Sequence, residues 1–245
     1  MSLLCQAGKL ALPIAVELIE KTQAVWKAEA QKTKAKSKYS KNEYLRAMLR
    51  VALPGWPQQQ VAYRYQLADS WYASAENLNA VLDLGHGFVM ALESSRTVAL
   101  SEAARAAGQF HAVDTLAFPD EQPLRVFFRS VAPAVLVTRQ VFINKDGSQG
   151  VLYLVSSDTS LNQGKLTPIY QRRWKVGEYH KSLKQNTSVG KSPTKKPDTQ
   201  ANHFFAEILA YSKLEALKVR HGIGYFLLKA QRYLAGLKAM NQELA

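Results

Sequence analysis

The sequence predicts an α/β fold, because short apolar strands and amphipathic helices alternate along much of the chain. Two strand-then-helix units predict it most directly: residues 61–87 and residues 87–108 each begin with an apolar or aromatic run and continue with a helical pattern. After residue 158 the pattern is helical to the end of the chain. At 245 residues, with 47% hydrophobic residues, the chain is long enough for one large domain or two small ones.

Composition indicates the compartment. The single cysteine, Cys5, excludes a disulfide framework and a cysteine-based zinc site, which favours a reducing environment. The first 21 residues lack the basic start and long apolar run of a signal peptide, and no stretch approaches 18 apolar residues. We therefore expect a cytoplasmic protein without a membrane partner.

The net charge of +13 is unevenly distributed. Residues 1–60 carry 10 Lys and Arg against 4 Glu, residues 61–163 carry 7 against 10 acidic residues, and residues 164–245 carry 15 against 5. Basic ends around an acidic middle favour a polyanion partner, most often nucleic acid. A basic protein without such a partner remains the alternative.

The first 60 residues contain three predicted elements. Alternating apolar residues at 3–20, with Gly8 at a turn, predict a hairpin whose second strand covers residues 13–21. The Lys-rich stretch 21–41 is typical of an exposed connection or a frayed helix. Asn42 is placed to cap a helix over 43–53, which Pro54 and Gly55 would end.

Asp69 is the first candidate for chemistry. It lies where the predicted strand that begins at Val61 ends and the helix over 73–87 follows. Ligands of α/β folds commonly bind at the carboxyl ends of strands. The alternative is that Asp69 or Ser70 only caps the helix.

Residues 110–158 are predicted to form strands only, in the four runs FHAVDTLAF, LRVFFRSV, AVLVTRQVFIN and GVLYLVSSD. An Asp146-Gly147 turn between the last two runs predicts a hairpin. This region is the acidic third of the chain, and its composition indicates an added sub-domain.

The stretch IYQRRWKVGEYHKSLK, residues 169–184, is the densest block of basic and aromatic residues. On a regular helix, Tyr170, Arg173, Gly177 and Lys184 lie within an arc of about 60°. Such a face suits phosphate, although a solvated basic helix has the same pattern. Two further amphipathic helices follow, in which Phe204, Ile208, Tyr211 and Leu214 are expected to pack in a core.

The sequence lacks the patterns of a histidine metal site and of nucleotide-driven chemistry. The five histidines show no metal-ligand spacing, and no phosphate-binding glycine loop is present. Carboxylate-held Mg²⁺ acting on phosphodiesters remains, which requires about three acidic ligands from separate elements. Asp69 is one candidate, and Glu178 is the only carboxylate between Asp158 and Asp198.

The segments YRYQLADSWYASAENL, GVLYLVSSDTSL and residues 169–217 resemble the DDE transposases of the insertion-sequence-four-like family, whose signature is Tyr-x2-Arg-x3-Glu-x6-Lys. The resemblance covers essentially the whole chain. It implies a ribonuclease-H-like catalytic core with a β-rich insertion and C-terminal helices. It also implies double-stranded transposon-end DNA as partner and Mg²⁺ or Mn²⁺ as cofactor, and it leaves a homodimer on DNA open.

Carried over by position, the resemblance implies that Asp69 is the second Asp, a catalytic metal ligand, and that Tyr170, Arg173 and Lys184 contact phosphates. Gly177 stands where the signature Glu is expected. Glu178 is the candidate substitute, although a regular helix turns it about 100° away from the signature face.

The first Asp of the family is expected on a strand upstream of Met1, because no Asp precedes Asp69 and Glu17 lies on a later strand than required. We therefore expect a core that is incomplete at its N-terminus. The expected parts are a partial ribonuclease-H-like core over 1–109, the insertion over 110–158, and over 159–245 the C-terminal helical part of the core with the signature helix.

The expected function is that of a transposase fragment that binds transposon-end DNA and has little or no strand-transfer activity. Two alternatives remain open at this point. One is a DNA-binding remnant or regulator of transposition without chemistry, and the other is a poorly folded gene fragment with an exposed sheet edge.

Overall fold

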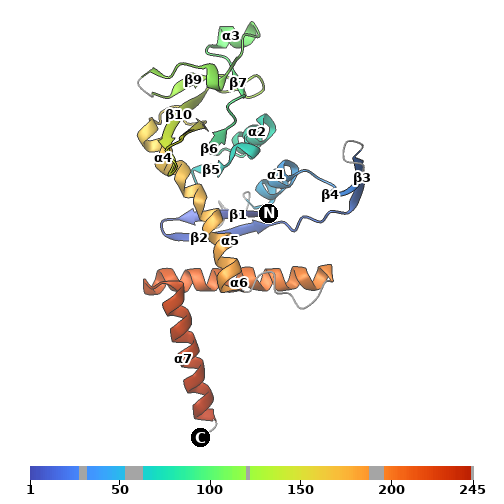
Figure 1. Cartoon of the computed structure of the whole chain (residues 1–245), viewed down its shortest axis with the longest axis vertical. Helices are drawn as coiled ribbons and strands as arrows, with labels where there is room; N and C mark the ends of the chain where they lie inside the picture. The colour runs from blue at the N-terminus through green and yellow to red at the C-terminus, as the bar shows by residue number, and fades with distance from the viewer. Residues whose placement is uncertain (28–31, 53–62, 120–121, 188–195, 244–245) are drawn as a thin grey trace. The chain divides into compact units, whose positions relative to one another are not determined.

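The computed structural model describes residues 1–27, 32–52, 63–119, 122–187 and 196–243 (Figure 1). The chain divides into two compact units. The sheet unit comprises Glu20–Arg173, and the helical unit combines Met1–Ile19 with Trp174–Ala245. No helix among the described residues is long and apolar enough to cross a membrane.

A five-stranded mixed sheet forms the centre of the sheet unit, in the order β5-β6-β11-β10-β9. β5 and β6 pair in parallel, and the other neighbours pair antiparallel. Together with the helices, this sheet confirms the predicted α/β class. The strands are β5 (Tyr65–Ala68), β6 (Gly87–Leu92), β9 (Leu124–Val126), β10 (Val135–Ile143) and β11 (Gln149–Ser156).

β6 is the most buried strand, because helices contact it from both faces. Every residue from Phe88 to Leu92 is buried. Val89 packs in a cluster with Leu166 and Tyr170 of α4 (Gln163–Gln171), whereas α2 (Ala75–Asp83) also contacts β6. Figure 1 shows α4 and α2 on opposite sides of this strand. A strand covered on both faces is apolar throughout, which explains the run GFVMAL.

The helices of the sheet unit begin at polar caps, as sequence rules predict, but not all at the expected residue. Ser74 caps α2, and Asn162 caps α4. At α1 (Lys41–Ala52) the prediction of Asn42 as the cap is wrong. Ser40 and Glu43 instead exchange hydrogen bonds, with Ser40 N–H to Glu43 Oε2 at 2.7 Å, a capping box. The residues expected to end this helix, Pro54 and Gly55, lie outside the described part of the chain.

The Lys-rich stretch 21–41 is not a simple connection or a frayed helix. It contains an antiparallel hairpin of β3 (Gln23–Lys27) and β4 (Lys32–Lys36), which pairs Gln23 with Lys36. In β4 (KTKAK) lysines alternate with Thr and Ala, and such alternation suits a strand despite the high charge.

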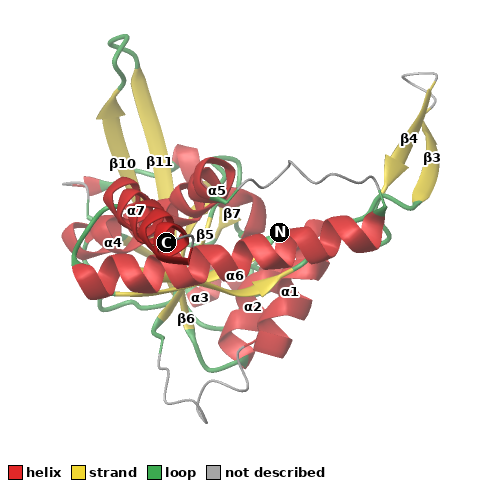
Figure 2. Ribbon diagram, turned by 90° about the horizontal axis from the view of Figure 1, so that it is seen from below, coloured by secondary structure: helices red, strands yellow, loops and turns green. Residues whose placement is uncertain are grey.

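The predicted hairpin around Asp146-Gly147 is confirmed. β10 and β11 pair from Leu136↔Ser156 to Ile143↔Gln149 and form the long ribbon of Figure 2. Gly147 occupies the left-handed region with φ 82°. The sharp reversal at this turn therefore requires a residue without a Cβ, which is why glycine is found there.

The predicted strand over 110–118 is largely wrong. Only β8 (His111–Ala112) is extended; it pairs with β7 (Thr97–Val98), and a 3₁₀ turn follows at Val113–Thr115. β9, β10 and β11, from the proposed insertion, share one sheet with β5 and β6. The boundaries at residues 109 and 158 stay predictions. The helix predicted between residues 101 and 108 is α3 (Glu102–Ala106).

The helical unit contains the predicted N-terminal hairpin and three helices. Gly8, with φ 57°, turns the chain between the two strands. Tyr179, Leu183 and Tyr211 form the buried cluster, and Leu4 packs against it. The elements are β1 (Ser2–Ala7), β2 (Leu10–Val16), α5 (Lys175–Asn186), α6 (Pro197–His221) and α7 (Tyr225–Glu243).

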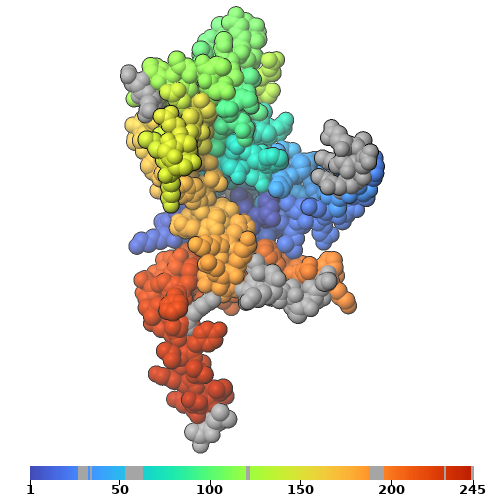
Figure 3. Space-filling view, in the orientation of Figure 1, coloured from blue at the N-terminus to red at the C-terminus, as the bar shows by residue number. Residues whose placement is uncertain are grey.

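α7 has many exposed apolar side chains, among them Phe226 and Tyr233, which are 89% and 74% exposed. In the space-filling view its atoms stand largely clear of the rest of the helical unit (Figure 3). At its start, the Tyr225 hydroxyl donates to Glu215 of α6, which also pairs with Lys218. This buried carboxylate therefore holds the first turn of α7 against α6.

Candidate functional site

Asp69 lies at the carboxyl end of β5, as the sequence predicts. It precedes a 3₁₀ turn, η3 (Ser70–Tyr72), and its side chain makes no capping hydrogen bond there. Ser74, five residues later, caps α2 by accepting from the N–H of Asn77. The alternative in which Asp69 or Ser70 caps this helix is therefore wrong, and the Asp69 carboxylate is available for another role.

Asn77 fixes the backbone that follows Asp69. Its side chain is fully buried, and its amide donates to the Tyr72 carbonyl oxygen and to Asn42 Oδ1, both at 2.9 Å. Its own Oδ1 accepts from Arg46 at 2.8 Å. All the hydrogen-bonding capacity of the amide is used except for one lone pair, so the connection from β5 to α2 is tied to α1. Sequence reasoning missed this residue, because an Asn inside an amphipathic helix carries no distinctive pattern.

One oxygen of the Asp69 carboxylate has no hydrogen-bond partner among the described residues. Oδ1 is buried and accepts no hydrogen bond from any residue that the structure describes. Tyr72 lies nearby: burial raises the pKa of its phenol, and the negative charge of Asp69 raises it further. A buried carboxylate oxygen without a donor costs free energy unless a cation or another ligand occupies it, so this atom suits a ligand.

Tyr170 and Arg173 lie in the same neighbourhood, although about a hundred residues separate them from Asp69. Burial raises the pKa of the Tyr170 phenol, the Arg173 charge lowers it, and the Asp69 charge raises it. The Arg173 guanidinium carbon lies 5.3 Å from the centre of the Tyr170 ring. Arg173 Nε is buried and lacks a hydrogen-bond partner among the described residues. The fold thus brings together three of the predicted site residues.

The other signature positions belong to the helical unit. The single helix predicted over 169–184 is interrupted: α4 ends at Gln171, a 3₁₀ turn covers Arg172–Trp174, and α5 carries Gly177, Glu178 and Lys184. Tyr170 and Arg173 belong to the sheet unit, whereas Gly177 and Lys184 belong to the helical unit, so the common face predicted for these four residues stays a prediction. That prediction assumed one regular α-helix, and the 3₁₀ turn at residues 172–174 interrupts it.

Glu178 and Lys184 are both exposed, and Glu178 pairs with Lys175 at 2.5 Å. A Cβ added at Gly177 would have no atom within 4 Å among the described residues. The glycine is therefore not required by packing, and a longer side chain has room at this position.

Asp158 is a carboxylate with a structural role. It accepts hydrogen bonds from Tyr65, Ser160 and Arg64, at 2.5, 2.6 and 3.0 Å. The hydrogen bonds from Ser160 and Tyr65 lower its pKa to about 2, and burial partly opposes them. Tyr65 opens β5 and Asp69 follows the end of this strand, so the two carboxylates lie at opposite ends of β5.

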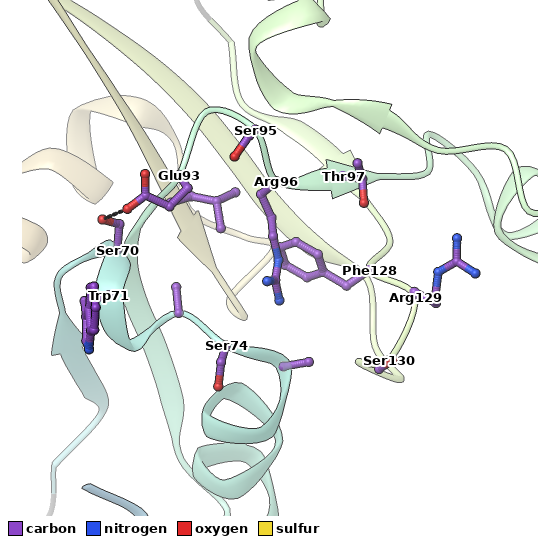
Figure 4. Close-up of a pocket in the computed structure, with 13 residues that line it drawn as sticks. Ser70, Trp71, Ser74, Glu93, Ser95, Arg96, Thr97, Phe128, Arg129 and Ser130 are labelled. Atoms are coloured by element: carbon purple, nitrogen blue, oxygen red, sulfur yellow. Dashed lines mark hydrogen bonds between the residues drawn. The ribbon is translucent and has the colours of Figure 1, made fainter. Parts of the chain in front are cut away.

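A pocket of about 500 Å³ opens beside the residue that follows Asp69 (Figure 4). Ser70 and Trp71 line it from the β5–α2 connection, Glu93 and Arg96 from the connection after β6, and Arg129 from the loop after β9. Glu93 accepts a hydrogen bond from Ser70. Sequence reasoning missed Glu93, although it follows a strand end just as Asp69 does.

The described residues offer an incomplete site for a divalent cation. Asp69 Oδ1 fits as one oxygen ligand, because it is buried and has no donor. No group of three His, Cys, Asp or Glu residues that could hold a metal is found in the part of the chain described. The predicted Mg²⁺ or Mn²⁺ site is thus supported at Asp69 alone.

A comparison with protein families supports the transposase part of the resemblance drawn from the sequence. The family described as "Transposase DDE domain" matches residues 45–213, more than two thirds of the chain. The matched range begins within α1, ends within α6, and contains Asp69, Tyr170, Arg173 and Lys184. No curated protein matched the chain.

Proposed function

Because this chain belongs to the transposase DDE domain family, we propose that it binds the DNA ends of a bacterial insertion sequence and has little or no strand-transfer activity. The observation that carries the proposal is the proximity of Asp69, Tyr170 and Arg173 within the sheet unit. In this proposal the core is that of a ribonuclease-H-like domain of the insertion-sequence-four-like family, with residues 110–158 as its β-rich insertion and residues 159–245 as its C-terminal helical part.

Phosphate binding is assigned to Tyr170, Arg173 and Lys184. Arg173 supports the assignment, because its planar guanidinium suits an oxygen of the DNA backbone and its Nε has no hydrogen-bond partner among the described residues. Lys184 is exposed and adds a cation from α5. The charge of +10 over residues 164–245 follows from the counts given above and favours the same polyanion.

Catalysis is proposed to be weak because the described residues do not provide three acidic ligands for a divalent cation. Asp69 would hold one divalent cation, which, when bound, polarises a phosphodiester and activates the attacking oxygen. Gly177 supplies no carboxylate, and Glu178 is paired with Lys175. The role of Asp69 in this chain is to present an oxygen that is already desolvated and has no donor to displace.

A regulator of transposition without chemistry is the second candidate function, and Gly177 at the signature Glu position favours it. Such a protein would occupy transposon ends without cutting them. It shares the DNA-binding residues with the first candidate, and differs from it in needing no metal at Asp69.

The test compares DNA binding with nicking. Fluorescence anisotropy with labelled duplexes from the DNA that flanks the coding sequence should give affinities that fall by orders of magnitude between about 50 and 200 mM salt. Arg173→Gln and Lys184→Gln should weaken binding, whereas the exposed controls Arg50→Gln and Lys213→Gln should not. Salt-independent binding would contradict the proposal.

Nicking of the same DNA with Mg²⁺ or Mn²⁺ separates the two candidates. Weak cleavage that Asp69→Asn abolishes identifies a residual enzyme, whereas binding that tolerates Asp69→Asn without any cleavage identifies the regulator. Efficient turnover by the unmodified chain would contradict the proposed lack of strand-transfer activity.

A further inference from the structure

Positive charge is concentrated in residues 21–41, the stretch that contains the β3–β4 hairpin. It has seven lysines and one acidic residue, Glu29, so 21 of the 245 residues carry +6 of the net charge of +13. The lysines of this stretch whose side chains the structure describes are all exposed, namely Lys21, Lys36, Lys38 and Lys41. Such a concentration of one charge at the surface favours a polyanion as partner.

The register of the hairpin, which Figure 2 shows as a two-stranded ribbon, gathers lysines on one face. Residues that pair across antiparallel strands share a face, and so do alternate residues along each strand. One face has the pairs Gln23↔Lys36, Val25↔Lys34 and Lys27↔Lys32. The other face has the uncharged pairs Ala24↔Ala35 and Trp26↔Thr33. We call the positions of Lys27, Lys32, Lys34 and Lys36 the lysine face.

The lysine face places like charges next to one another. Lys27 lies directly opposite Lys32, and like charges directly opposite each other destabilise an antiparallel pair. Along β4 the lysines recur at every second residue, about 7 Å apart. Phosphates bound to this face would remove the repulsion, so the arrangement suits a bound polyanion better than solvent.

A short structured connection joins the ribbon to α1. Residues 37–40 separate β4 from α1. The Ser37 hydroxyl donates to the Tyr39 carbonyl oxygen at 2.7 Å, and the Tyr39 ring packs edge to face on Tyr44 of α1, with 5.8 Å between the ring centres. The capping box described above follows directly. The lysine face therefore belongs to a ribbon that is tied to the start of α1.

Resting on the proposed function for its DNA partner, we propose that the lysine face is a second contact surface for duplex DNA, which binds phosphates without reading the base sequence. The major groove admits a two-stranded ribbon. From Lys32 to Lys36 the row of lysines spans about 13 Å, close to the groove width of about 12 Å, so it can reach phosphates on both sides of the groove. A lysine ammonium is a point charge on a flexible stem, which suits a phosphate better than a base edge.

An anionic membrane surface is the other polyanion that a basic ribbon could meet. An element that lies in a membrane surface also needs an extended apolar face that enters the lipid. Of the four positions opposite the lysine face, Trp26 is large and apolar, whereas the others are two alanines and a threonine. The apolar area is therefore small, and the observations favour DNA.

The experiment measures the affinity for a 20-base-pair duplex at several salt concentrations by fluorescence anisotropy. The ribbon variant is Lys32→Gln/Lys34→Gln/Lys36→Gln. Its plot of log affinity against log salt should be shallower by about two to three, since each phosphate contact contributes about 0.9 to the slope. The loss should be equal for a duplex from the flanking DNA and for an unrelated duplex of the same length, because phosphate contacts carry no sequence information.

Two controls separate the lysine face from total charge and from folding. The control variant, Lys9→Gln/Lys145→Gln/Lys213→Gln, removes three exposed lysines elsewhere in the chain and has the same net charge as the ribbon variant, so its slope should match that of the unmodified chain. Lys32→Arg/Lys34→Arg/Lys36→Arg keeps the charges and should keep the slope. Thermal melting of the ribbon variant should not move down, because fewer like charges meet across the strands.

An unchanged slope in the ribbon variant, together with weaker binding by Arg173→Gln, overturns the inference and leaves the proposed function standing. An equal fall of the slope in the control variant also overturns it, because total charge then decides binding. Binding to vesicles of anionic lipid that the ribbon variant loses, with its DNA slope unchanged, assigns the face to a membrane and overturns the inference. A shallower slope in the ribbon variant with full binding by Arg173→Gln supports the inference and contradicts the phosphate contact assigned to Arg173. Salt-independent binding of duplex by the unmodified chain contradicts both proposals.

Discussion

The side-chain amide of Asn77 donates to the backbone carbonyl oxygen of Tyr72 at 2.9 Å, and thereby fixes the connection that carries Asp69. The same amide joins Asn42 and Arg46 of α1 to this connection. A single buried side chain thus ties the end of β5 to two helices. The geometry around Asp69 depends on residues that make no contact with any proposed substrate.

Asn77→Leu should lower the stability of the sheet unit by about 2–4 kcal/mol, because it leaves buried donors and acceptors unpaired. Hydrogen exchange of the β6 amides measures this loss as a lower opening free energy. Asn79→Ala in the same helix is the control: Asn79 donates only to the Ser130 carbonyl at a more exposed site, so its loss should cost about 1 kcal/mol or less. Equal effects of the two changes would contradict the role given to Asn77.

Gly177→Glu should not destabilise the protein, because no described atom lies within 4 Å of the added Cβ. Replacing a helical glycine in the first turn of α5 with Glu should raise stability by up to about 1 kcal/mol. Gly108→Glu is the contrasting change, since Gly108 has φ 72° and a side chain there is strained. Thermal melting should move up for the first variant and down for the second.

The activity of Gly177→Glu makes a separate prediction. Restoring a carboxylate at this one position should leave nicking with Mg²⁺ or Mn²⁺ close to that of the unmodified chain, because no group of three possible metal ligands is found among the described residues. A gain of tenfold or more in nicking rate by Gly177→Glu alone would show that the remaining ligands are present.

Asp158 should stabilise the sheet unit in a pH-dependent way. Its pKa is lowered to about 2 in the folded protein, below its ordinary value of 3.8, so its contribution is present above about pH 4 and is lost as the pH falls towards 2. Asp158→Asn should therefore cost about 1–2 kcal/mol at pH 7, allowing for solvent screening of the Arg64 pair, and much less at pH 2.5. Denaturant unfolding of Asp158→Asn and of the exposed control Asp83→Asn at both pH values measures the two free energies of unfolding. A loss of stability in Asp158→Asn that is the same at both pH values would contradict this prediction.

Glu215→Ala should loosen the helical unit. Glu215 is 2% exposed and pairs with Lys218 and the Tyr225 hydroxyl, so its removal leaves a half-buried hydroxyl and an ammonium without this partner. We expect a loss of about 3 kcal/mol, seen as faster hydrogen exchange in α6 with unchanged exchange in β6. Glu207→Ala is unsuitable as a control, because the Glu207 side chain is only 12% exposed and pairs with His203. The exposed residue Lys213 therefore serves as the control, as Lys213→Ala. Equal acceleration in β6 would argue that the two units do not open separately.

The sequence by itself determined the α/β class, the position of Asp69 at a strand end, the β10–β11 hairpin and the C-terminal helices. Each of these follows from local rules: the spacing of apolar residues along the chain, turn residues such as Asp146-Gly147, and the length of each patterned segment. The resemblance to DDE transposases was also carried by sequence alone, and the family match over residues 45–213 confirms its transposase part.

Only the tertiary structure decided which groups surround Asp69. The hydrogen bonds of the buried Asn77 amide to α1 and the pocket of Trp71 and Arg96 depend on contacts between distant segments. The capping box of Ser40 and Glu43 is instead local, and its Ser-x-x-Glu pattern is present in the sequence. The interruption of the helix at Arg172–Trp174 leaves no mark in a basic, Pro-free stretch. Local patterns determine secondary structure, but the partner of a polar side chain is set by packing between elements, which no single stretch of sequence contains.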